Sequence, residues 1–195
     1  MAEQWKALGH RAINALIAAS AQPLGPSFGI ASAALSARTT QMETLAGGPP
    51  VDWDSVVLDG PAARLEQAMR ALESYNELVH RVFRVLSVYG KLLGVITDGA
   101  LWQSWAQSKD DALHYNHQVS QRLRSVAAYD LATVDAFTVA RSFPDNSPAS
   151  VAWMRAAKIL AVRAKAEAGA MTQSQANMCS AVHRVCHYGR AILPP

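Results

Sequence analysis

Apolar residues recur at helical spacing along most of the chain, and no stretch of useful length alternates as a β-strand would. Near the start, for example, Trp5, Leu8, Ala12 and Leu16 follow one another at intervals of three or four. The pattern and its interruptions predict helices over residues 3–20, 30–45, 61–80, 81–96, 101–107, 110–129 continuing to 141, 150–169 and 171–188. We therefore expect an all-α fold.

Proline and glycine mark the expected boundaries between these helices. Gly47-Gly48-Pro49-Pro50 is the strongest break in the chain, and Pro61 is suited to the first turn of a helix. The stretch 143–148 predicts a loop, after which Ser150 is a candidate cap. These breaks predict an extended N-terminal arm or subdomain (1–50), a helical core (51–170) and a C-terminal helix and tail (171–195).

The composition narrows the class of protein. Half of the residues are hydrophobic, 17% are charged, and the formal net charge is +3 with a pI of about 9.0. No apolar run is long enough to suggest a membrane-spanning helix, and two cysteines do not make a disulfide scaffold. We expect a soluble protein of a reducing compartment with no membrane partner, whose mild positive charge tolerates a polyanion.

One group of cations shares a side of a predicted helix. At 100° per residue, Arg81, Arg84 and Lys91 fall on one side, while Val82 and Leu86 fall on another. Arginine suits phosphate because its guanidinium donates to two oxygens in parallel. The stripe is therefore a candidate phosphate contact, and the alternative is the solvated face of a core helix.

A second group combines two arginines with a single acid. Arg122 and Arg124 precede an apolar run that ends at Asp130. An acid in this position lies either at the surface or in the interior, and a buried carboxylate requires an arginine because burying it unpaired is costly. A buried Asp130 would thereby hold an arginine rigidly beside a phosphate.

The remaining candidates for chemistry are weak. Cys179, His183, Cys186 and His187 share one helical face, but ligands along one helix cannot surround a tetrahedral zinc ion, so we expect neither metal nor cofactor. His114 and His117 lie near two aspartates in the sequence, but no nucleophile or metal partner accompanies them. We therefore expect that the protein is not an enzyme. Tryptophans can stack on bases, but at helical spacing they more often belong to a core; those considered are Trp102, Trp105 and Trp153.

Several short motifs follow one another in a recognisable order between residues 65 and 165. They are Arg81-Val82-Phe83, the segment Leu101-Trp102-Gln103-Ser104-Trp105, Ala127-Ala128-Tyr129-Asp130, Arg141, the loop around Pro144, and a helix with Ala157-Lys158, Ala161 and Arg163. In order and rough spacing this part of the chain resembles the coat proteins of flexuous filamentous plant RNA viruses, the potexvirus-like (alphaflexivirus-like) group in particular.

The resemblance implies a viral coat (capsid) protein that binds single-stranded genomic RNA without sequence specificity and polymerises with copies of itself into a flexible filament. It implies that Arg81 contacts phosphate, that Asp130 supports it, and that a serine before the core, Ser32 or Ser36, lines the groove. The full set of expected RNA-binding residues is Arg81, Asp130, Arg84, Lys91, Arg122, Arg124 and Ser36. The location would be the virion and the host cell cytoplasm.

The residues leave one alternative open. Low charge and alanine-rich helices are also typical of a helical protein–protein interaction or scaffold module that binds no nucleic acid.

Overall fold

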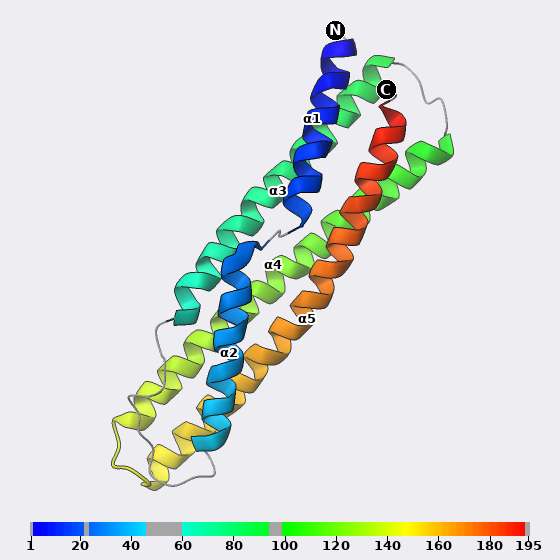
Figure 1. The fold of residues 1–195 in the computed structure, drawn as a ribbon. Coiled ribbons are helices and arrows are strands. Elements are labelled where there is room, and N and C mark those ends of the chain that lie inside the picture. Colours follow the sequence, from blue (N-terminus) through cyan, green and yellow to red (C-terminus); the bar gives the residue numbers. More distant parts are fainter. Residues whose placement is uncertain (1, 22–23, 46–59, 94–98, 194–195) are drawn as a thin grey trace. The chain divides into compact units, whose positions relative to one another are not determined.

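The structure is a computed structural model, and it describes residues 2–21, 24–45, 60–93 and 99–193. These residues form five helices and no strand (Figure 1), which confirms the all-α fold. The helices are α1 (Ala2–Ser20), α2 (Gly25–Leu45), α3 (Gly60–Leu93), α4 (Gly99–Arg141) and α5 (Pro148–Ile192). None of the helices in the described ranges is both long and apolar enough to cross a membrane.

The helices are longer than the sequence pattern predicted. The expected helices 61–80 and 81–96 form one helix, α3, and the expected end of the second lies outside the described residues. Similarly, the expected helices 101–107 and 110–141 form one helix, α4, and α5 continues through Gly169, where we expected one helix to end and another to begin. The boundary at Gly169 was wrong because one glycine inside a helix costs only about 1 kcal/mol, which packing of the flanking turns can offset.

The start of α5 shows why Ser150 is not its cap. Pro148 opens the helix, since its fixed φ and missing N–H suit the first helical position. The preceding residue, Ser147, then takes the cap position, and the backbone N–H of Ser150 donates to Ser147 Oγ at 3.2 Å. Asn146 completes the turn with a positive φ of 60°.

The chain divides into two compact units that each combine distant segments. Unit 1 contains residues 1–23, 70–119 and 173–195, and unit 2 contains residues 24–69 and 120–172. Helices α3, α4 and α5 each contribute to both units, whereas α1 belongs to unit 1 and α2 to unit 2. The expected arm, core and C-terminal segment stay a prediction.

Unit 1 has an aliphatic core drawn from several helices. Ile13 of α1, Leu86 of α3, Val119 of α4 and Met178 of α5 are all fully buried. A Cβ atom at Gly189 of α5 would lie 3.1 Å from the side chains of both Ile13 and Leu86. The absence of a side chain at this position therefore allows α5 to approach α1 and α3 closely.

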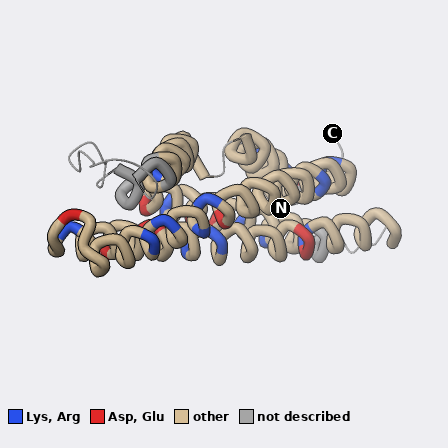
Figure 2. The backbone as a smooth tube through the Cα atoms, turned by 90° about the horizontal axis from the view of Figure 1, so that it is seen from below, with Lys and Arg blue, Asp and Glu red and all other residues tan. Residues whose placement is uncertain are grey.

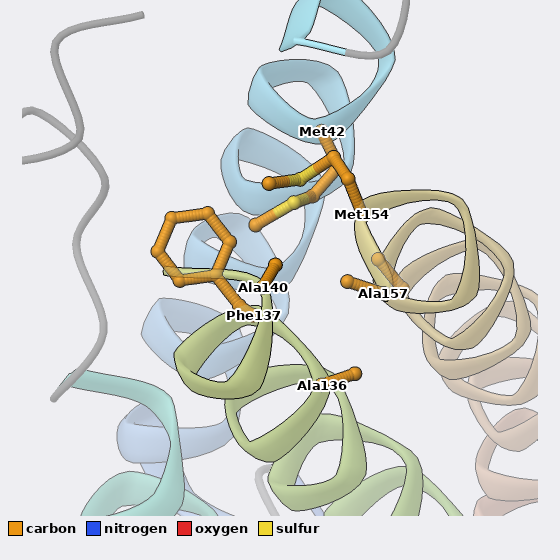
Figure 3. Close-up of a cluster of buried hydrophobic side chains, with 7 residues drawn as sticks. Met42, Ala136, Phe137, Ala140, Met154 and Ala157 are labelled. Atoms are coloured by element: carbon orange, nitrogen blue, oxygen red, sulfur yellow. The ribbon is translucent and has the colours of Figure 1, made fainter. Parts of the chain in front are cut away.

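Unit 2 contains a core of methionine, phenylalanine and alanine. Met42 of α2, Phe137 and Ala140 of α4, and Met154 and Ala157 of α5 pack against one another (Figure 3). Alanine keeps the helix backbones close, and the flexible methionines fill the space that remains.

Candidate functional site

Asp130 lies in the interior of unit 2 and is paired with an arginine. Arg38 of α2 and Asp130 of α4 are 2% and 1% exposed, and Arg38 Nη1 donates to Asp130 Oδ1. The other carboxylate oxygen, Oδ2, has no hydrogen-bond partner among the described residues. Thus the expectation that a buried Asp130 requires an arginine is confirmed.

The electrostatics of this pair are dominated by its burial. Removal from water raises the pKa of Asp130 above its ordinary value, and the charge and hydrogen bond of Arg38 act in the opposite direction. Because Asp130 is almost completely covered, it cannot contact a strand of RNA directly. Its role is to bind α2 to α4 within unit 2.

The identity of the partner corrects the proposed Arg81–Asp130 pair. Arg81 is exposed, and its Nη2 atom donates to Glu77 Oε1 at 2.9 Å, one turn earlier on α3. Arg81 belongs to unit 1 and Asp130 to unit 2. The prediction was wrong because the cation that shares the interior with Asp130 is Arg38, and Arg81 points to solvent.

The other expected RNA-binding residues are divided between the units. In unit 1, Arg84 is exposed on α3, while the side chain of Lys91 lies outside the described part of the structure. In unit 2, Arg124 is exposed, Ser36 is half-buried, and Arg122 Nη1 donates to Glu167 Oε2 at 3.1 Å. The structure therefore does not gather these residues in one unit.

The cysteines and histidines near the end of α5 do not form a reactive cluster. Cys186 is buried, and its burial raises the thiol pKa to about 11, although Arg190 acts against the shift. Cys179 Sγ donates to the carbonyl oxygen of Ser20 at 3.3 Å, and its pKa is also raised by burial. Since thiolates are the reactive form, protonated thiols such as these are poor nucleophiles and ligands. Within the described residues, no group of three or more His, Cys, Asp or Glu side chains could hold a metal ion.

The tryptophans differ in their surroundings. Trp105 is buried in unit 1, with its ring centroid 6.0 Å from Phe83 and 5.1 Å from Trp102. Trp153 is 42% exposed on α5. Trp105 is therefore a core residue, as helical spacing favours, whereas Trp153 belongs to the surface.

The two units differ in net charge rather than in the number of cations. Unit 1 contains nine Lys and Arg against six Asp and Glu, and it also contains all six histidines. Unit 2 contains nine residues of each sign, so the net charge of +3 comes from unit 1. Figure 2 shows the Lys and Arg positions distributed along the helices.

Exposed apolar side chains are concentrated in the other unit. Among the described residues, unit 2 contains seven of the eight large hydrophobic side chains that are exposed, and four of the seven lie on α5. Unit 1 contains the eighth, Leu8. The seven in unit 2 are Ile30, Leu131, Phe143, Val151, Trp153, Ile159 and Val162.

Comparison with protein-family models, with curated proteins and with solved structures finds no match for this chain.

Proposed function

We propose that this protein is a structural subunit that binds single-stranded RNA and associates with copies of itself, as the resemblance to flexuous filament coat proteins implies. The supporting observation is the division of surface properties. The net positive charge lies in unit 1, and nearly all exposed large apolar side chains lie in unit 2. A polyanion favours the first kind of surface and a protein partner favours the second.

The RNA half of the proposal concerns α3. Arg81 and Arg84 are exposed there, and Glu77, the carboxylate that pairs with Arg81, is itself exposed. An exposed ion pair of this kind contributes only about 0.2–1 kcal/mol, so Arg81 can exchange Glu77 for a phosphate at little cost. Contacts to phosphate carry no sequence information, which suits a subunit that packages any RNA sequence.

The second half of the proposal, association with copies of the same chain, concerns the apolar residues of unit 2. Ile30, Leu131 and Ile159 are each at least half exposed, on three different helices. Contiguous exposed apolar groups mark surfaces that another protein covers, and this half of the proposal assigns these side chains to such a surface. Head-to-tail contacts between different faces of identical subunits produce an open helical filament when the rotation between copies does not close a ring.

A second candidate function is a helical interaction module that binds protein without RNA. The same exposed side chains of unit 2 favour it, because they require only a protein partner.

Electron microscopy of nuclease-treated protein mixed with polyuridylate separates the two candidates. We expect long, bending filaments that retain the RNA after purification. Discrete small oligomers without retained RNA would reject the proposal and favour the interaction module.

The α3 cations are tested by comparing two double variants. We expect Arg81→Ala with Arg84→Ala to weaken polyuridylate binding about tenfold at low salt, because two phosphate contacts are lost. The control, Arg64→Ala with Arg163→Ala, removes two exposed cations of unit 2 and should change the affinity by less than about twofold. Fluorescence anisotropy measures both affinities, and circular dichroism checks the folding. Equal loss in the two variants would contradict a role for α3.

A further inference from the structure

One face of α5 in unit 2 is both apolar and basic. Residues 146–166 contain four Lys and Arg and no Asp or Glu. Val151, Ile159 and Val162 are 38%, 56% and 43% exposed, and Arg155 is exposed between them. Because successive steps of four, four and three residues return to the same side of a helix, these four residues share one face. Lys158 and Lys165 lie beside it at the same spacing. We call these six residues the α5 outer face.

An occupant of the α5 outer face must supply both apolar groups and negative charge. A two-fold contact between two copies of this face would bury cations against cations, which is unfavourable. Phosphates of RNA would satisfy the cations but leave Ile159 and Val162 without an apolar partner. An acidic protein segment with large apolar side chains meets both requirements.

The chain itself contains a segment of this chemistry. The 25 residues between Arg38 and Arg64 include four acids and no Lys or Arg. Within them, Val51-Asp52-Trp53-Asp54-Ser55-Val56-Val57-Leu58-Asp59 combines three aspartates with five large apolar residues. Residues 46–59 lie outside the described part of the structure and enter here by their sequence alone.

The exposed acids of α3 are a less suitable occupant of the α5 outer face. Glu66, Glu73 and Glu77 are exposed on α3, but Arg70 and Arg81 alternate with them on the same helix. The acids of this surface are interspersed with arginines, and the described side chains of α3 include no exposed large apolar group. The stretch 51–59 is therefore the better complement in both charge and hydrophobicity.

We propose that the α5 outer face of one copy binds residues 51–59 of a neighbouring copy. The inference rests on the self-association half of the proposed function and names its partner segment. The two surfaces are different, so the contact is head-to-tail and leaves one face of each kind open for the next copy. Such a contact extends a chain of subunits without requiring RNA.

Charge reversal tests the proposal by sedimentation velocity on the full, nuclease-treated chain without RNA. We expect the wild type to associate with increasing concentration, and less strongly in high salt, which screens the ion pairs. Lys158→Glu with Lys165→Glu should weaken association about tenfold, as should Asp52→Lys with Asp54→Lys. Combining all four changes should restore it to within about threefold, because the pairs are re-formed with opposite signs.

The controls separate a specific contact from a general loss of charge or of folding. Arg11→Glu on α1 should leave the association unchanged. Ile159→Ser should weaken it, whereas Leu8→Ser, at the exposed position of unit 1, should not. A monomer at all concentrations, or failure of the combined variant to associate, would overturn the proposal. Because RNA is absent, association that follows this pattern supports the contact even if RNA binding fails.

Discussion

Arg38 and Asp130 place one positive and one negative charge in the interior of unit 2. Removing one partner leaves the other charge buried, so we expect Asp130→Ala to lower the free energy of unfolding by about 3–5 kcal/mol. Replacing both, as Arg38→Met with Asp130→Leu, should cost far less, since neither charge then remains in the interior. Urea denaturation followed by circular dichroism measures both values. A loss below about 1 kcal/mol in Asp130→Ala would contradict the buried pair.

The pH dependence of stability tests the environment of the same carboxyl group. Burial raises the pKa of Asp130 in the folded chain, so the folded protein takes up this proton more readily than the unfolded chain does. The contribution of Asp130 to stability therefore grows as the pH falls, and it is lost as the pH rises through the raised pKa. Asparagine keeps a hydrogen-bond acceptor for Arg38 but does not titrate.

We therefore expect the wild type to gain stability relative to Asp130→Asn as the solution is acidified from neutral pH. Urea denaturation of the two proteins at several pH values measures the difference. If the wild type instead loses stability relative to the variant, the attraction of Arg38 outweighs burial and the pKa lies below its ordinary value.

At the residue scale, the sequence predicted that a buried Asp130 requires an arginine, but it did not identify Arg38 as that arginine. The position of Asp130 after an apolar run indicated that a buried acid there would need an arginine. Arg38 was missed, although it is the only Lys or Arg between Arg11 and Arg64 and lies in a helix of small residues. The choice between Arg38 and Arg81 depends on which helix packs against α4 at Asp130, and local sequence does not contain that information.

At the scale of the helices, the sequence predicted that these segments are helical, but it did not predict how long each helix is. Helical spacing identified every described helix, whereas the ends at His80, Gln107 and Gly169 were wrong because α3, α4 and α5 continue through them. A glycine signals a possible end only when nothing beyond it holds the helix together. Past Gly169, buried side chains such as Met171 and Met178 keep α5 on the core.

Two glycines of α5 provide an internal comparison. A Cβ atom at Gly169 meets nothing within 4 Å, so Gly169→Ala should raise the free energy of unfolding by about 0.5–1 kcal/mol through reduced backbone entropy. A Cβ atom at Gly189 lies 3.1 Å from Ile13 and Leu86, so Gly189→Val should destabilise by about 1–3 kcal/mol through overpacking. Chemical denaturation measures both. A stabilising Gly189→Val would show that α5 does not approach α1 and α3 this closely.

At the scale of the whole molecule, the two units depend on contacts between distant residues. In unit 1, Arg190 Nη2 donates to Asn14 Oδ1 at 3.3 Å, and Arg184 Nη2 donates to Asp111 Oδ2 at 3.0 Å. Residues this far apart in the sequence come into contact because the helices fold back alongside one another. Helical periodicity does not define that arrangement, so the separation of charge from exposed apolar groups emerged only from the structure.

This separation predicts that the two proposed activities can be removed one at a time. Arg81→Ala with Arg84→Ala should reduce RNA affinity about tenfold but leave self-association in RNA-free buffer unchanged, because no apolar residue of unit 2 is altered. Ile159→Ser should weaken self-association and yet bind a short oligouridylate as the wild type does at protein concentrations where both are monomeric. Anisotropy measures the first property and sedimentation velocity the second. If either variant loses both properties while remaining folded, RNA binding and association share one surface, and the assignment of charge to one task and exposed apolar groups to the other is wrong.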